Sequence, residues 1–394
     1  MIDFIPGKTW IPTSGYIVGD LEANNLQPIV DNIRKGILPK YELCAKFEKR
    51  FAKVAGQTYC HMVNSGSSAN ELAVQVLMAE ELGTLRLKPG DEIITTALTF
   101  PTSLAPIIRA GLIPVFVDVD LPYYVPVRRT DYDTAVFAVH LFGNTSSQIF
   151  RGTHWIIGDC CDALGTENFD NSLASFSNIS TFSFYPAHHI TTLEGGAVCT
   201  SDPKFSKLIK SFRDWGRDCW CEPGQNNACG HRFDGEYDHK YIYSHIGYNF
   251  KATDFQAALG LAQLDRLEGF IEKRKHNFER LSEGLKDCDW LILPKPTPFS
   301  DVSWFGFPLT IREDVEMNAR DMQIKLAEYK IDSRRIFAGN ILKQPAYKNI
   351  KHRTKGELPN TNLIHEKGFW IGLYPGITDE MIDYMIEVIC ILKT

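Results

Sequence analysis

Short hydrophobic runs alternate with helix-like stretches between about residue 60 and residue 200. Several of these runs are nearly all apolar, which is typical of strands covered on both faces. Strands that alternate with helices indicate an α/β domain with a mostly parallel sheet. The pattern predicts strands at Glu92–Ala97, Ile113–Asp118, Thr134–His140, Trp155–Asp159, Ile179–Phe184 and Gly196–Thr200.

Capping-box spacing marks two helix starts. Ser68-Ala69-Asn70-Glu71 predicts a helix to about Leu82, and Thr253-Asp254-Phe255-Gln256 predicts the start of a second, long helix. From about Phe270 helical and strand patterns are mixed, which predicts a smaller domain. We therefore expect a large domain over residues 1–265 and a small C-terminal α+β domain over 266–394.

Composition narrows the class of protein. The chain has 394 residues and a formal net charge of −6, which argues against nucleic acid or an anionic membrane as its main partner. No apolar run approaches the roughly 20 residues that span a bilayer. The N-terminus shows no basic segment followed by an apolar one, so we expect a cytoplasmic protein whose ten cysteines are not disulfides.

One loop has the composition of an anion site. Asn64-Ser65-Gly66-Ser67-Ser68 precedes a predicted helix. Small residues there let the backbone approach an anion, and the helix N-terminus attracts its charge. By itself this is also an ordinary junction between a loop and a helix.

This loop and a series of further short motifs together are stronger evidence of function than the loop alone, because the motifs follow one another in a fixed order. They are Asn64-Ser65-Gly66-Ser67, Ala97-Leu98-Thr99-Phe100-Pro101-Thr102, His140-Leu141-Phe142-Gly143, Gly158-Asp159-Cys160-Cys161-Asp162-Ala163-Leu164-Gly165, the segment from Ser183 to Gly196, and Gly247-Tyr248-Asn249-Phe250-Lys251-Ala252-Thr253-Asp254. From about residue 15 to the end, the chain resembles the DegT/DnrJ/EryC1/StrS sugar aminotransferase and dehydrase family. This resemblance implies the aspartate aminotransferase-like fold type I of the pyridoxal-phosphate enzymes.

The resemblance also implies the residues that hold the cofactor. Gly66, Ser67 and Ser183 would bind its phosphate, and Phe100 would stack on its pyridine ring. Asp159 would face the pyridine nitrogen and keep it protonated. Asn249 would come from the neighbouring subunit, which makes a homodimer the working unit.

A missing lysine separates this chain from the aminotransferases of the family. Those enzymes carry a Schiff-base lysine after the Ser-Phe-x-Pro-x segment, and here His188 stands at that position. No lysine occurs between Lys88 and Lys204. Imidazole can move protons but cannot tether the cofactor as an imine. His188 therefore resembles the catalytic histidine of the dehydrase subgroup, with Asp162 and Tyr185 shaping its surroundings and His189 packed or hydrogen-bonded.

Four cysteines form a second group of candidate functional residues, besides those around the cofactor. Cys219, Cys221 and Cys229 lie in a long stretch, from about Asp214 to Tyr243, that predicts an ordered loop, and Cys161 follows Asp159 by two residues. Loops of this length are usually functional. Four thiolates suggest a metal centre, and their spacing leaves zinc and iron–sulfur open. Cys160 is expected to be a buried thiol, while His231 is close enough in sequence to replace a ligand.

The cysteine set resembles that of the iron–sulfur dehydrases of this family, which implies a [2Fe–2S] cluster. The implied function is pyridoxamine-phosphate-dependent C3 dehydration of a nucleotide-linked 4-keto-6-deoxyhexose, with CDP-4-keto-6-deoxy-D-glucose as the substrate, in 3,6-dideoxysugar biosynthesis. A separate flavin and iron–sulfur reductase would supply electrons, because the chain has no Gly-x-Gly-x-x-Gly fingerprint. Arg334 is a candidate for the substrate diphosphate, or a solvated surface arginine.

Three alternatives remain open at this point. A cluster-free dehydratase of the GDP-4-keto-6-deoxymannose type, which uses glutamate to regenerate its cofactor, would share His188 but not need the four cysteines. A sugar aminotransferase would need the absent lysine. A catalytically inactive protein of the same fold could carry a structural zinc, although Asp159, His188 and the phosphate loop argue for retained chemistry.

Overall fold

A computed structural model describes residues 4–127, 135–145, 154–219, 221 and 227–392. Its core is an eight-stranded sheet with the order β1-β9-β8-β5-β4-β2-β3-β14. Neighbouring strands from β8 to β14 are parallel, and only the pairs β8–β9 and β9–β1 are antiparallel. The strands are β1 (Tyr59–Val63), β2 (Glu92–Thr96), β3 (Ile113–Val117), β4 (Ala135–Val139), β5 (Ile156–Asp159), β8 (Ile179–Ser183), β9 (Gly196–Thr200) and β14 (Arg353–Thr354).

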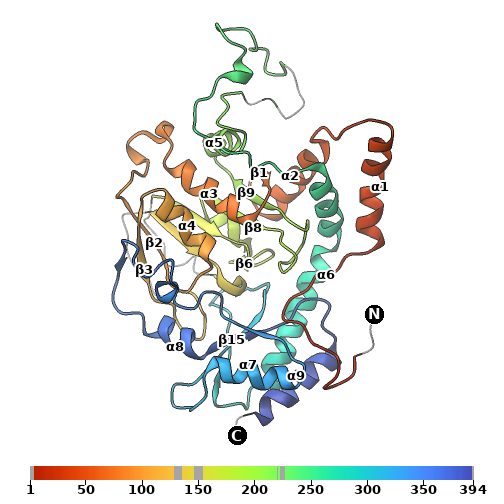
Figure 1. Cartoon of the computed structure of the whole chain (residues 1–394), viewed down its shortest axis with the longest axis vertical. Helices are drawn as coiled ribbons and strands as arrows, with labels where there is room; N and C mark the ends of the chain where they lie inside the picture. Colours follow the sequence, from red (N-terminus) through yellow and green to blue (C-terminus); the bar gives the residue numbers. More distant parts are fainter. Residues whose placement is uncertain (1–3, 128–134, 146–153, 220, 222–226, 393–394) are drawn as a thin grey trace.

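The six predicted strands are confirmed, each within two residues at either end, except that Thr134 lies outside the described residues. The predicted fold class is also confirmed, because the sheet is mostly parallel and helices pack on it (Figure 1). All five residues of β4 are buried, as expected for a strand covered on both faces.

The helices are α1 (Asp20–Arg34), α2 (Glu42–Val54), α3 (Gly66–Leu77), α4 (Pro101–Arg109), α5 (Pro203–Arg213), α6 (Asp254–Gly284), α7 (Ala319–Glu328), α8 (Pro359–Lys367) and α9 (Asp379–Ile391). The predicted start of α3 at Ser68 is wrong by one turn. The N-cap is Ser65, whose extended backbone lets its Oγ accept a hydrogen bond from the Ser68 N–H. The helix ends at Leu77, before the predicted Leu82, and a 3-10 turn, η1 (Glu80–Leu85), follows.

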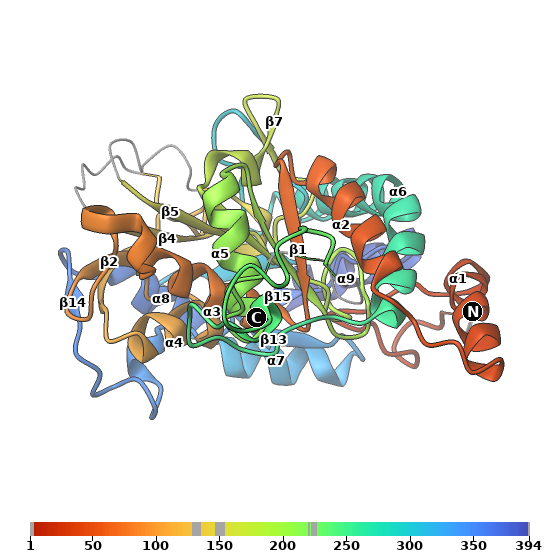
Figure 2. The same cartoon turned by 90° about the horizontal axis from the view of Figure 1, so that it is seen from above.

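The capping box that opens α6 is confirmed, because Thr253 and Gln256 bond reciprocally. This long helix contacts α1 and α2 near its start and α9 near its end (Figures 1 and 2). Residue 265 lies inside α6, so the division of the chain at that residue stays a prediction.

Two smaller antiparallel sheets complete the fold. One has the order β10-β12-β15-β13, with β10 (Leu291–Ile292), β12 (Phe307–Ile311), β13 (Ser333–Arg335) and β15 (Gly368–Ile371). The other pairs β11 (Ser300–Asp301) with β6 (Glu167–Asn168) and β7 (Asn171–Ser172). No helix among the described residues is long and apolar enough to cross a membrane.

Residues 214–249 form a segment that we call the arm. It leaves the body beyond the C-terminal end of α5 and projects at the top of Figure 1. Apart from one 3-10 turn, η5 (His239–Tyr241), its described residues contain no helix or extended strand. The predicted long loop is therefore confirmed for the part of it that the structure describes.

Candidate active site

A cavity of about 690 Å³ lies at the carboxyl ends of the parallel strands. Ligands bind at this edge in open α/β sheets, because the strand-to-helix loops converge there. One side is built by residues that follow β1, β2, β5 and β8, and the other by β13, β15 and the loops beside them. Its lining includes ten residues that the sequence singled out: Gly66, Ser67, Phe100, Asp159, Cys161, Asp162, Ser183, Tyr185, His188 and Arg334.

The anion cradle lies at the N-terminus of α3. Gly66 and Ser67 are the first residues of this helix, and both line the cavity together with Ser183. A Cβ at Gly66 would lie 2.6 Å from the Cβ of Ser183, so only glycine allows this close approach. The residues present therefore fit a phosphate group, which the amides and the helix dipole would attract.

Replacing Gly66 with alanine is expected to weaken binding of the cofactor phosphate by about tenfold or more, which corresponds to 1–2 kcal/mol. The added methyl group would displace Ser183 from the cradle. Titration with pyridoxamine phosphate, followed by fluorescence, measures the change. Ser67→Ala serves as the matched control, because it keeps the backbone amide and should cost less. Equal affinity for Gly66→Ala and the wild type would contradict the assigned cradle.

Asp159 ends β5, is buried and accepts three hydrogen bonds. Its Oδ2 accepts from Asn70 Nδ2 at 2.9 Å and from Ser103 Oγ at 2.7 Å, and its Oδ1 accepts from the Cys161 N–H at 3.2 Å. Three donors therefore hold this carboxylate in position at the edge of the cavity. Asp159 therefore fits a partner for a protonated ring nitrogen.

Phe100 is the N-cap of α4 and presents a half-exposed ring to the cavity. Its ring lies 6.2 Å from that of Phe337, edge to face, so a flat face remains for a stacked ligand. Asn249 does not line the cavity of its own chain. It is exposed, and its Oδ1 accepts from Lys251 Nζ at 2.6 Å.

His188 lies inside the cavity, 3.6 Å from Asp162 (Nδ1 to Oδ1). Burial and the nearby Arg274 guanidinium lower the pKa of His188 to about 4, against the effect of a hydrogen bond to the backbone of Cys161. Burial raises the pKa of Asp162 to about 8, although the Phe142 N–H donates to it. His188 is therefore a neutral base at physiological pH, beside a carboxyl group that retains its proton.

Rate measurements against pH test this electrostatic assignment. Because the pKa of His188 is lowered, its base form persists well below pH 6.5 and is lost only as pH falls towards about 4. Solvent exchange of the cofactor C4′ protons should therefore show no midpoint near pH 6.5. NMR of the complex in D₂O between pH 5 and 7 measures it. A midpoint at the ordinary imidazole pKa would contradict the buried, neutral base.

Sequence reasoning missed the residues that hold the His188 loop. Arg274 of α6 is fully buried and donates to three backbone carbonyls, those of Trp304, Phe305 and His188. His189 packs in the same region, with Nε2 at 3.1 Å from the Ser303 carbonyl, as predicted. A buried arginine in a helix gives no local signal of the carbonyls that it meets.

An aromatic wall was also missed. Phe305, Phe337 and Trp370 line the cavity and contact one another, and the His188 ring lies 5.3 Å from that of Phe305. Arg334 and Arg335 of β13 lie beside this wall. The cavity thus combines apolar surface with two guanidinium groups, which suits a ligand that carries both a sugar and phosphates.

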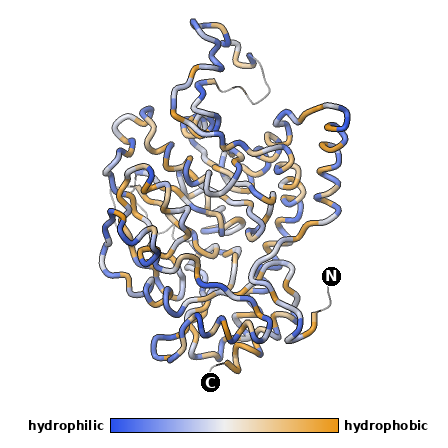
Figure 3. Tube along the Cα trace, in the orientation of Figure 1, coloured by the Kyte–Doolittle hydropathy of each residue, from blue (hydrophilic) through white to orange (hydrophobic). Residues whose placement is uncertain are grey.

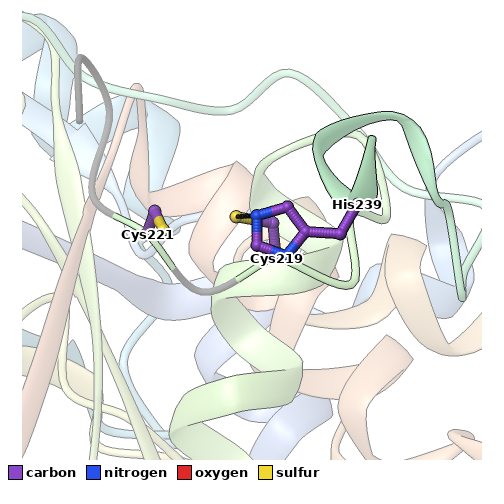
Figure 4. Close-up of side chains that lie close together, drawn as sticks. All are labelled: Cys219, Cys221 and His239. Carbon is purple, nitrogen blue, oxygen red and sulfur yellow. Dashed lines mark hydrogen bonds between the residues drawn. The ribbon is translucent and has the colours of Figure 1, made fainter. Parts of the chain in front are cut away.

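The four cysteines lie in two places. Cys161 lines the cavity, where burial and the Asp159 carboxylate raise its pKa well above the usual range. Cys219, Cys221 and Cys229 lie in the arm near His239. Figure 4 shows three of these side chains, Cys219, Cys221 and His239. The Sγ atoms of Cys219 and Cys229 are 3.3 and 3.4 Å from His239 Nε2. Cys160 is buried, as predicted.

The arm thus presents a group of metal-ligating side chains. The ligand atoms of Cys219, Cys221 and His239 lie within 4.8 Å of one another. Burial acts to raise the pKa of Cys221, but hydrogen bonds from Cys229 and Cys219 outweigh it and hold this pKa below the usual range. The donor set therefore fits a thiolate-bound metal. His231, the candidate from the sequence, instead pairs with Asp234, and His239 takes its place.

The fold and the cavity define a vitamin B6 enzyme of fold type I. The pattern of the DegT/DnrJ/EryC1/StrS aminotransferase family matches residues 20–390, and the chain belongs to this family.

Two relatives and one pair of solved structures are similar over nearly the whole chain. The lipopolysaccharide biosynthesis protein RfbH of Salmonella typhimurium is 46% identical over 98% of this chain and 92% of its own length. The dTDP-4-dehydro-2,6-dideoxy-D-glucose 3-dehydratase of Saccharopolyspora spinosa is 41% identical over 98% of this chain and 87% of its own. Two solved structures of GDP-4-keto-6-deoxymannose-3-dehydratase are also similar, one from E. coli with hydrated PLP and one of a variant with GDP-perosamine. Each has a TM-score of 0.86 and is 28% identical, and the match covers 96% of this chain and 99% of the solved chain.

Proposed function

We propose that this chain is a pyridoxamine-phosphate-dependent 3-dehydrase of a nucleotide-linked 4-keto-6-deoxyhexose, completed by a [2Fe–2S] cluster and a separate reductase. The main observation in favour of dehydrase activity is the position of His188. It is a neutral base inside a cavity whose described lining contains no lysine. A base without a tethering amine favours proton transfer over transamination. The 3-dehydratases among the similar proteins support the same reaction class.

Pyridoxamine phosphate, when bound, supplies an amine for the sugar ketone and a pyridinium that accepts electrons. Gly66, Ser67 and Ser183 would bind its phosphate, Phe100 would cover its ring, and Asp159 would keep the ring nitrogen protonated. In a dimer, Asn249 of the second subunit would add a contact that one chain does not provide.

His188 would take a proton from the C4′ carbon of the cofactor and give a proton to the departing hydroxyl oxygen at sugar C3. Asp162, 3.6 Å away, would orient the imidazole. Tyr185 lines the same cavity and would limit the position of the sugar. Arg334 would pair with the diphosphate, because a guanidinium matches phosphate geometry.

The thiolates would hold a cluster that supplies electrons one at a time. The particular substrate, CDP-4-keto-6-deoxy-D-glucose, and the product class, a 3,6-dideoxy-4-ketosugar, are supported by the resemblance of the cysteine set. The electron donor would be a flavin and iron–sulfur reductase.

Metal analysis of anaerobically purified protein tests this proposal. We expect about two irons and about two acid-labile sulfides per chain, with a visible charge-transfer band. Cys221→Ala should lose both, whereas Cys199→Ala, a buried cysteine of β9, should keep them. Zinc without sulfide would contradict the electron-transfer part and would indicate a Cys₃His site built with His239.

A further inference from the structure

The proposed ligand set is divided within one chain. Cys161 lies in the cofactor cavity, and the charged groups that act on it are Asp159 and Asp162. No described residue of the arm lines that cavity. Cys219 instead lines a separate hollow of about 230 Å³ with Glu81, Lys204 and His245. The cysteines of the arm meet His239 and not Cys161.

The root of the arm, residues 214–218 and 242–249, is tied to the body because the His245 ring contacts Ser211 of α5 and Glu81. These contacts hold Cys219 beside Glu81, outside the cavity of its own chain. The two sides of the root bridge at Asp214–Asn249 and at Arg217–Tyr243. Gly216 has φ +83°, and a Cβ there would lie 1.8 Å from the His245 carbonyl oxygen. The Asp218 N–H donates to the Ile242 carbonyl at 3.0 Å, and Cys219 follows directly.

A buried arginine, which directly precedes the arm, bonds its first residue. Arg213, at the C-terminal end of α5, is 0% exposed. It bonds Asp214 and Glu48, each at 2.9 Å, and the Tyr41 hydroxyl at 2.5 Å. Breaking such a buried network is strongly destabilising, so Arg213 fixes Asp214, the first residue of the arm, against α2.

The arm exposes large apolar side chains to solvent. Trp215, Phe233, Tyr237, Tyr241, Tyr243 and Ile246 are all exposed, Ile246 at 97%. In Figure 3 the projecting segment is mostly hydrophilic, with a few hydrophobic positions between. Aromatic side chains gathered on a projection are typical of a protein interface. Asn249, which the family resemblance assigns to the neighbouring subunit's cofactor, lies at the same root.

We propose that the arm docks on a second copy of this chain and that each metal centre is shared between subunits. Cys161 of one subunit supplies one ligand, and Cys219, Cys221 and Cys229 of the other supply three. This inference rests on the proposed function. The partner on which the arm docks is therefore a second copy of this chain. Within one chain Cys161 lies apart from the three cysteines of the arm, and the arm of the second copy would bring three such cysteines to it. His239 keeps the sulfurs of Cys219 and Cys229 together before docking.

Heterodimers with two affinity tags test the shared centre. One chain carries Cys161→Ala with an intact arm, and the other carries Cys219→Ala with an intact Cys161. A shared centre gives this heterodimer one complete ligand set, so we expect about half the wild-type iron, sulfide and electron paramagnetic resonance signal of the reduced cluster. Either variant homodimer should have none. Cys221→Ala replaces Cys219→Ala if the latter lowers the melting temperature.

The reciprocal heterodimer pairs a wild-type chain with the double variant Cys161→Ala/Cys219→Ala. A shared centre predicts no cluster here, whereas a centre within one chain predicts half. If this reciprocal heterodimer held half the wild-type iron and sulfide, and the first heterodimer held none, the shared centre would be wrong and the proposed function would remain. A fully loaded Cys161→Ala homodimer would also overturn it, with His239 as the fourth ligand. Wild-type protein without iron and sulfide would instead overturn the proposed function itself.

Discussion

The His188→Ala variant is expected to exchange the cofactor C4′ protons about 10²–10⁴-fold more slowly than the wild type, the usual contribution of a general base. No other described imidazole lines the cavity except that of His140, which has no hydrogen-bond partner and whose pKa burial lowers to about 3. Binding of pyridoxamine phosphate should be retained, because the cradle and Asp159 are unchanged. Hydrogen–deuterium exchange at C4′, followed by NMR, gives the rate.

The neighbouring histidine provides the control. His189 contacts the Ser303 carbonyl and does not line the cavity, so His189→Gln should keep the exchange rate within about threefold, as expected for a residue outside the transition state. If His188→Ala exchanged at the wild-type rate with cofactor bound, His188 would not be the base. If both variants were equally slow, their effect would be structural.

The Asp159→Asn variant should lose proton exchange by about 10²–10³-fold, the range seen when one preorganised electrostatic partner is removed. Without the carboxylate, the ring nitrogen loses its proton and the ring accepts electrons poorly. An amide would also place its NH₂ group either against the donors Asn70 and Ser103 or against the Cys161 N–H. The absorption spectrum of the bound cofactor and the exchange rate measure these two effects.

Ser103→Ala is the matched control for Asp159. It removes the 2.7 Å hydrogen bond from Ser103 Oγ and keeps the charge, so the expected loss is about tenfold or less, a net 0.5–1.5 kcal/mol. An Asp159→Asn variant with unchanged exchange would show that this carboxylate does not control the ring. A Ser103→Ala variant as slow as Asp159→Asn would show that the hydrogen-bond network matters more than the charge.

Local sequence predicted the strands well, because hydrophobic runs that alternate with helix-like stretches identify β2, β4, β5 and β8. The family resemblance singled out Phe100, Asp159 and Ser183, which lie at or just after the ends of such strands. The family resemblance then located His188 and Arg334 in the same cavity. The start of α3 was misplaced because Ser65 and Ser68 both have N-cap chemistry, and only backbone conformation distinguishes them.

Residues that act through tertiary contacts could not be predicted in this way. Phe305, Phe337 and Trp370 are far apart in sequence and meet only where the small sheet closes over the cavity. His239 lies 20 residues after Cys219 in a stretch without periodicity, so nothing local connects the two. Arg274 reads as a surface arginine of a long helix, although it is buried against three carbonyls.

Product analysis of one anaerobic reaction tests the central claim most directly. The holoenzyme, loaded with pyridoxamine phosphate and cluster, is mixed with CDP-4-keto-6-deoxy-D-glucose and a flavin and iron–sulfur reductase with NADH, without glutamate. Two electrons and two protons from this system should replace the C3 hydroxyl by hydrogen and release water. NMR should then show a methylene at C3 of the sugar. A product that keeps its C3 oxygen and gains an amino group, or turnover that needs glutamate and no reductase, would contradict reductive 3-dehydration.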